Sequence, residues 1–128
     1  MDRAHRVIEL TNHERIKRGL PALTWNEQLF KAAQGHCVDM ANGDFFDHRQ
    51  MAERVREEKY KYSAVAENIA AGDSRPEDVV SGWMNSSGHR NNILNPNYRE
   101  IGVGHHYREN DPGRFKYKHY WTQIFGKR

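Results

Sequence analysis

The sequence predicts an α+β fold, and two features of its hydrophobic pattern support this prediction. Apolar residues recur at helical intervals through most of the first two-thirds of the chain, whereas residues 101–125 alternate between two faces. Residues 110–113 (Asn-Asp-Pro-Gly) are a strong turn signal inside that alternating part, as in a β-hairpin. A chain of 128 residues has room for one core, so residues 1–128 are expected to form one domain.

The first two helices are predicted from their ends as well as from their faces. Residues 3–18 are expected to be helical as far as Gly19, with these residues near one stripe: Val7, Leu10, Glu14 and Ile16. Residues 24–27 (Thr-Trp-Asn-Glu) have the spacing of a capping box, and the face that follows is apolar or small: Leu29, Ala32, Ala33, Cys37 and Met40. A left-handed residue near Gly43 is expected to end this second helix.

The middle of the chain predicts a short helix, a strand and a third substantial helix. Residues 49–58 are charged enough for a short exposed helix, and residues 63–70, rich in small and apolar side chains, could form a strand. Residues 74–77 repeat the capping pattern with Pro76 in the first turn, and the helix they begin has this buried face: Val79, Val80, Trp83 and Met84. A further turn is expected from Ser87 to about Asn95, because the residue before a proline avoids helical angles.

The C-terminal third is expected to be a β-hairpin. One face of its first strand carries Ile101, Val103, His105 and Tyr107, and the other carries Gly102, Gly104 and His106. The second strand, residues 115–125, places Tyr117, His119 and Trp121 on one face and Tyr120, Thr122 and Ile124 on the other.

Composition and charge exclude several classes of protein. The net charge is +3 with a pI near 9.1, but lysines and arginines are interleaved with acids, so nucleic-acid binding is not expected. No apolar run approaches the roughly 20 residues that cross a bilayer. The start of the chain is charged and lacks the apolar stretch of a signal peptide, so either the protein stays inside the cell or a leader was removed.

The single cysteine, Cys37, cannot form an intrachain disulfide and is expected to be a small buried residue.

Six segments carry a resemblance to a known family. They occur in order between about residues 7 and 126: residues 23–26, 46–48, 66–70, 83–96, 100–104 and 120–123. Together they resemble the bacterial branch of the CAP superfamily, which groups cysteine-rich secretory, antigen 5 and pathogenesis-related 1 (SCP-like) proteins. The resemblance implies a three-layer α-β-α sandwich with a central antiparallel sheet.

The resemblance also implies a cleft where two histidines and two acids meet. Matched by motif, the histidines are His48 and His89, and the first acid is Glu67. The position of the second acid, three residues after Trp83, is Ser86 here, which removes one base or ligand. Mechanisms that require two carboxylates are therefore in doubt.

Three roles stay open for the cleft residues. Two neutral imidazoles, His48 and His89, could share a divalent cation such as zinc, with Glu67 as third ligand, as a partner that fixes a tautomer, or as a base toward bound water. If Ser87 caps the turn that begins at His89, the helix end should favour the neutral imidazole. Alternatively, the three side chains form a hydrogen-bonded network that only braces the cleft.

The third role is catalysis, for which the candidates are Glu67, Ser86 and His89. Ser86 or Ser87 lies close to His89 in sequence and Glu67 could orient the histidine, but no Gly-x-Ser-x-Gly motif is present.

Other side chains are expected to have structural roles. His105 and His119 could face one another as a second metal pair, although an exposed sheet face explains them more simply. The helix histidines are expected to be solvated or partly buried: His5, His13 and His36. The aromatic residues Trp83, Tyr120 and Trp121 are expected in the core or the wall of the cleft. Asn68 is expected to anchor the backbone through its amide.

These observations predict a secreted or envelope-facing binding module whose cleft, formed by His48, Glu67, Ser86 and His89, accepts a divalent cation and a small or lipid-like ligand. Lipid binding enters by resemblance alone, and a cytoplasmic location stays open. The alternative is an extracellular hydrolase, metal-assisted or serine-type, that acts on peptides or wall fragments. A third class is an interaction protein that binds a cell-surface or extracellular partner through its basic outer face. A monomer is expected.

Overall fold

The computed structural model describes residues 2–110 and 117–128. Within these residues the chain forms, in order, α1 (Arg3–Ile16), β1 (Thr24–Trp25), α2 (Glu27–Gly43), α3 (Met51–Glu57), β2 (Ala64–Ala71), α4 (Pro76–Met84), α5 (Ser87–Ile93), β3 (Glu100–Tyr107) and β4 (His119–Lys127). No helix in this part of the chain is long and apolar enough to span a membrane.

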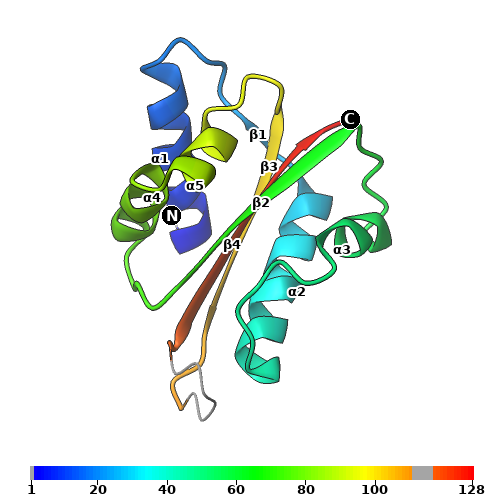
Figure 1. The fold of residues 1–128 in the computed structure, drawn as a ribbon, viewed down its shortest axis with the longest axis vertical. Helices are drawn as coiled ribbons and strands as arrows, with labels where there is room; N and C mark the ends of the chain where they lie inside the picture. Colours follow the sequence, from blue (N-terminus) through cyan, green and yellow to red (C-terminus); the bar gives the residue numbers. More distant parts are fainter. Residues whose placement is uncertain (1, 111–116) are drawn as a thin grey trace.

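The elements form three layers, as the resemblance implied (Figure 1). The sheet has the strand order β1-β3-β4-β2, in which β2, β4 and β3 are antiparallel and the two-residue β1 pairs with β3 in parallel. Helices α1, α4 and α5 cover one face, and α2 and α3 cover the other (Figure 1). The α+β class and the hairpin of β3 and β4 are therefore confirmed. Residues 111–116, where the turn was predicted and the last strand was expected to begin, lie outside the described residues.

The buried face of α1 is more polar than predicted. Its buried residues are Val7, Thr11 and Arg15, whereas Ile16 is 59% exposed, so the predicted stripe is wrong at that residue. Arg15 can be buried because its guanidinium donates hydrogen bonds to four carbonyl oxygens: Pro21, Ile93, Asn95 and Tyr98. This one side chain joins α1 to the segment that follows α5.

Helix α2 begins later than the capping box predicted. Asn26 is the N-cap, and its side chain accepts a hydrogen bond from the Leu29 amide, while Thr24 belongs to β1. The left-handed residue that ends the helix is Asp44 (φ 55°), not Gly43. The apolar face is as predicted, and Cys37 is buried within it.

The N-caps of α4 and α5 also differ from the prediction. Arg75 precedes Pro76 as the N-cap of α4, and neither Arg75 nor Ser86, the N-cap of α5, makes a side-chain capping bond. The capping role predicted for Ser74 is therefore wrong, and the condition that Ser87 caps the next turn is not met. Packing holds α4 instead, since Val79, Val80 and Trp83 are buried and the Trp83 indole donates to the Ile69 carbonyl, and Ile93 is the buried residue of α5.

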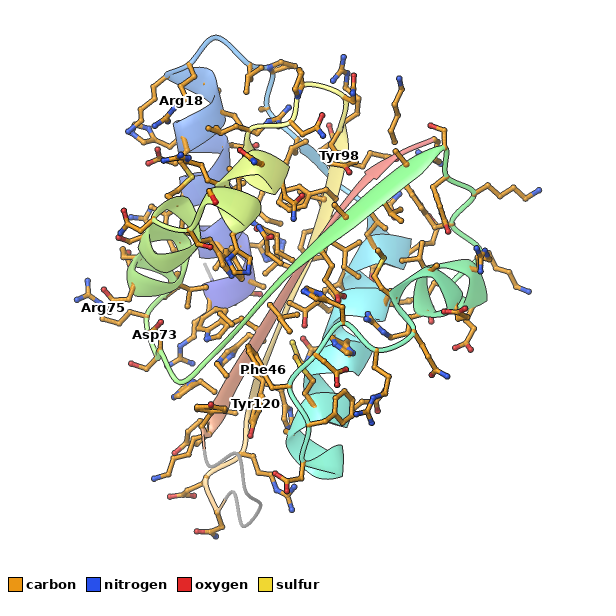
Figure 2. All side chains as sticks on the ribbon, in the orientation of Figure 1. Arg18, Phe46, Asp73, Arg75, Tyr98 and Tyr120 are labelled. Atoms are coloured by element: carbon orange, nitrogen blue, oxygen red, sulfur yellow. The ribbon has the colours of Figure 1, made fainter. Side chains whose placement is uncertain are left out.

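Two glycines bring β3 against α2. A Cβ atom at Gly102 would lie 2.2 Å from the backbone nitrogen of Phe30, and one at Gly104 would lie 2.6 Å from the backbone nitrogen of Gln34. Only residues without a Cβ atom allow this approach between strand and helix backbones. On the same layer, Phe46 packs in the cluster that contains Tyr120 (Figure 2), which fixes the loop that leads to His48.

Candidate functional site

The candidate site is built around Glu67, a carboxylate on β2 whose side chain is 1% exposed. Its Oε1 atom lies 2.8 Å from Nδ1 of His48, and both carboxylate oxygens are bound by Arg54. Strand β2 is the edge strand beside β4, and the loop 44–50 and α3 bring His48 and Arg54 to it. Two of the three side chains predicted to meet, His48 and Glu67, are therefore in direct contact.

Arg54 neutralises Glu67 through a bidentate ion pair. Its Nη1 donates to Oε2 at 2.8 Å and its Nη2 to Oε1 at 3.1 Å. The Nε atom donates to the Arg49 carbonyl at 2.9 Å, so Arg54 also ties the loop after His48 to the site. Burial raises the pKa of Glu67, but the hydrogen bonds from His48 and Arg54 outweigh it and hold the pKa below its usual value.

This arrangement fixes the tautomer of His48. An ionised carboxylate only accepts hydrogen bonds, so Nδ1 of His48 must carry the proton that it donates to Glu67. In the neutral ring, Nε2 then holds the lone pair. The His48 side chain is 52% exposed, so the ring is accessible while Nδ1 is bonded to a buried acid.

His36, expected to be solvated or partly buried, is instead part of the site. Its side chain is 1% exposed, and its Nε2 donates to the Asp47 carbonyl at 2.7 Å and lies 4.0 Å from Oε1 of Glu67. Burial lowers the pKa of His36, and the opposing effect of Glu67 does not reverse this. His36 therefore positions the backbone next to His48 as a neutral ring.

His89 approaches the site from the opposite helical layer. It lies in the first turn of α5, and Asn68 holds its backbone by donating to the His89 carbonyl at 3.2 Å, which is the anchoring role predicted for Asn68. Burial lowers the pKa of His89, and the nearby His48 lowers it further. The neutral imidazole is thus favoured by burial, and the expected cap by Ser87 plays no part. Among the described residues, the His89 ring makes no hydrogen bond to Glu67.

The serines lack the geometry of a nucleophile. Within the described residues, the hydroxyls of Ser86 and Ser87 make no hydrogen bond to His89 or Glu67. Glu67, another of the catalytic candidates, is already bound by Arg54 and His48. The structure therefore brings His48 and Glu67 into contact and leaves Ser86 outside their hydrogen-bond network.

Sequence reasoning missed Arg54 and His36, although the pattern held a signal for each. His36 falls seven residues after Leu29, on the face that was correctly predicted to be buried, and a polar side chain on such a face needs a partner. Arg54 precedes Val55, the buried residue of α3, and lies three residues after Met51. Several acids lie near it in sequence, among them Glu53, Glu57 and Glu58, so the sequence did not identify Glu67 as its partner.

Two further features bear on metal binding. No group of three or more His, Cys, Asp and Glu side chains in residues 2–110 and 117–128 is arranged to hold a metal ion. Away from the site, Nε2 of His105 lies 2.9 Å from Nδ1 of His119, so the two histidines do face one another across the hairpin as one alternative predicted. They form a hydrogen bond between rings, and His105 also packs on Trp121.

Comparisons with known proteins agree with this fold. The profile of the cysteine-rich secretory protein family (CAP) matches residues 8–125. YkwD of Bacillus subtilis is 45% identical over 105 residues, which cover 78% of this chain and 41% of YkwD. The Bacillus subtilis membrane protein YlbC is 33% identical over 127 residues, which cover 95% of this chain and 34% of YlbC. The chain thus spans less than half the length of these curated relatives.

Solved structures extend the likeness. An extracellular protein containing an SCP domain from Bacillus anthracis has a TM-score of 0.84 at 31% identity, covering 98% of this chain and 40% of that protein. An outer surface protein from Borrelia burgdorferi has the same TM-score of 0.84 at 21% identity, covering 97% of this chain and 91% of that protein, which supports the fold alone. On the ordered motifs, the three-layer architecture and the matched profile, this chain belongs to the CAP (cysteine-rich secretory protein) family.

Proposed function

We propose that this domain is an extracellular binding module that holds a divalent cation such as zinc between His48 and His89. The observation that carries the proposal is the hydrogen bond of 2.8 Å between Nδ1 of His48 and Oε1 of Glu67. A carboxylate that binds one ring nitrogen fixes the tautomer and raises the basicity of the other nitrogen, as in many zinc sites. Nε2 of His48 is then the atom that would bind the metal.

The chemistry of the other side chains fits an open two-histidine site. The lowered pKa of His89 keeps its ring neutral, which is the form that binds a metal. Glu67 supports His48 and is itself compensated by Arg54, so the prediction of Glu67 as a third ligand is less favoured than its orienting role. A site with two protein ligands leaves two positions of a tetrahedral metal for water or a small ligand.

The same geometry disfavours the hydrolase alternative. A general base must accept a proton, but the pKa of Glu67 is lowered by hydrogen bonds from His48 and Arg54 despite its burial. Neither serine is activated by a histidine in the described part of the chain. A lipid-like ligand stays a prediction that rests on family resemblance.

The extracellular location is proposed from the Bacillus anthracis relative. That protein is extracellular, shares 31% identity with this chain, and contains the same type of domain. This chain matches only 40% of that protein, so the proposal uses the matched SCP domain and not the rest of the relative.

The test is zinc titration of the wild type and three variants, measured as the melting temperature and by calorimetry. Saturating zinc should raise the melting temperature of the wild type, because a ligand that binds only the folded state stabilises it. His48→Ala and His89→Ala should each abolish the shift. Glu67→Gln should weaken zinc binding by roughly tenfold or more through loss of the orienting carboxylate.

Two controls separate this cleft from other histidines. His13→Ala changes an exposed histidine on α1 and should keep the full zinc shift. His105→Ala removes the hairpin pair and should also keep it. A wild-type melting temperature that saturating zinc leaves unchanged would favour the network that only braces the cleft, and a zinc shift that survives in His48→Ala and His89→Ala would contradict the proposed site, because the zinc would then bind elsewhere.

A further inference from the structure

A cavity of about 480 Å³ opens where α3 ends and the chain enters β2. It shares no residue with the candidate site and is lined by three cations and two tyrosines: Arg56, Lys59, Tyr60, Lys61 and Tyr62. No carboxylate is among these described lining residues. We propose that this cavity binds an anion that carries phosphate groups.

The three cations are available to a ligand. Arg56, Lys59 and Lys61 are exposed, and in the described part of the chain none of their side chains makes an ion pair. The Arg56 guanidinium lies 5.9 Å from the centre of the Tyr62 ring, which directs it along the aromatic wall. Guanidinium and ammonium groups both bind phosphate oxygens, and three of them around one cavity match a multiply charged anion.

The floor of the cavity is held by contacts within the fold. Tyr60 is buried, and its hydroxyl donates to Oε1 of Glu100 at 2.7 Å. A Cβ atom at Gly126 would lie 2.4 Å from that hydroxyl, so the ring packs directly on the backbone of β4. Arg128 forms an ion pair with Glu100 at 2.7 Å, which compensates the carboxylate behind the floor. A fixed floor lowers the conformational cost of binding.

The backbone of Lys59 supplies a second, independent observation. The Lys59 amide donates to the Arg56 carbonyl at 2.9 Å and the Tyr60 amide donates to the Val55 carbonyl at 3.4 Å, which is the Schellman pattern at the end of α3. Lys59 has φ 66°, in the left-handed region where glycine is usual. A lysine here makes the fold less stable than a glycine would, while it keeps an ammonium at the cavity.

Folding separates these cations from their neighbours in sequence. Along the chain, Glu57 and Glu58 lie between Arg56 and Lys59, so the charges look balanced. In the fold, neither acid lines the cavity. Its volume also falls in the range of about 300–1,000 Å³ that is typical of small-ligand sites.

The test uses two probes that carry the same chemistry from different sources. Inorganic tripolyphosphate is titrated calorimetrically, and phosphatidylglycerol in phosphatidylcholine vesicles is tested by co-sedimentation. The double variant Lys59→Gln/Lys61→Gln should weaken binding at least about tenfold, because each charged hydrogen bond contributes severalfold or more. The matched control, Lys31→Gln/Lys118→Gln, removes the same charge from exposed lysines on α2 and before β4 and should bind like the wild type.

The pattern over the two probes decides the ligand source. If Lys59→Gln/Lys61→Gln, but not the control variant, binds tripolyphosphate more weakly than the wild type does, the result supports a soluble phosphate compound. If the same variant loses binding only to the vesicles, the result supports a lipid headgroup. Equal weakening in both double variants, or no binding of the wild type to either probe, would overturn the proposal.

A single variant keeps the test independent of misfolding. Lys59→Gly relieves the left-handed backbone, so it should raise the melting temperature by about 3 °C while it weakens binding several-fold. A Lys59→Gly protein that binds the selected probe as tightly as the wild type would overturn the assignment of Lys59.

Discussion

Arg54 holds Glu67 through two hydrogen bonds, of 2.8 and 3.1 Å, at a position where the carboxylate is almost completely buried. The ion pair and the hydrogen bond from His48 explain how a buried acid on β2 can stay ionised. It also explains why Glu67 directs His48 instead of acting as a free base. The site is therefore an Arg-Glu-His network, in which His36 and Asn68 hold the backbones of the loop and of α5.

The first prediction concerns this ion pair. Arg54→Leu leaves a buried carboxylate without its main partner and should lower the free energy of unfolding by about 3 kcal/mol. Urea unfolding at neutral pH measures the change. The double variant Arg54→Leu/Glu67→Leu removes both charges and should recover most of the loss. Equal loss in the single and double variants would mean that the pair does not compensate the burial of Glu67.

The second prediction concerns the contact between β3 and α2. Gly102→Ala should lower the free energy of unfolding by at least about 3 kcal/mol, because the added methyl group would lie 2.2 Å from the Phe30 nitrogen and cannot be accommodated by a side-chain shift. Thermal and urea unfolding measure this. Gly35→Ala is the matched control, since nothing lies within 4 Å of its Cβ position on α2. It should stabilise the protein by about 0.5–1 kcal/mol.

The third prediction concerns the histidine pair on the hairpin. Burial lowers the pKa of His105 to about 4, with smaller effects of His119, Arg3 and His106. Below about pH 6.5 the unfolded chain binds a proton at this residue, whereas the folded protein stays neutral there until about pH 4. The free energy of unfolding should therefore fall as the pH is lowered from 6.5 to 4.

His105→Phe removes the titrating group and keeps an aromatic ring on Trp121. Urea unfolding of the variant at several pH values should show a shallower fall over that interval than the wild type. Parallel pH profiles for the two proteins would contradict the prediction.

The fourth prediction concerns Cys37. Its thiol is buried and donates to the Thr122 hydroxyl at 3.2 Å, and burial raises the pKa of the thiol to about 12. A thiol at this position is neither accessible nor ionised near neutral pH, so a chromogenic disulfide reagent should label it only as fast as the protein unfolds. Rapid labelling of the folded protein, at the rate seen in urea, would contradict this.

Much of the fold could be predicted because it depends on local patterns. The stripe of Leu29, Ala32 and Cys37 fixed the face of α2, and the alternation of Ile101 and Val103 fixed the face of β3. The ends of elements were less predictable, since capping chemistry at Thr24 and Ser74 is only one of several ways to satisfy free amides. At Thr24 the competing partner was strand β3, which is distant in sequence.

The sequence by itself determined the α+β class, the family motifs and the identity of His48, Glu67 and His89 as site candidates, because these depend on local order along the chain. Only the tertiary structure decided what surrounds Glu67. Arg54 and His36 are 13 and 31 positions away from Glu67 in sequence. Their charge and polarity do not show that they face Glu67 until α2, α3 and β2 are packed together. The cavity at Lys59 has the same origin, since Glu57 and Glu58 separate Arg56 from Lys59 along the chain, and neither acid lines the cavity once the chain is folded.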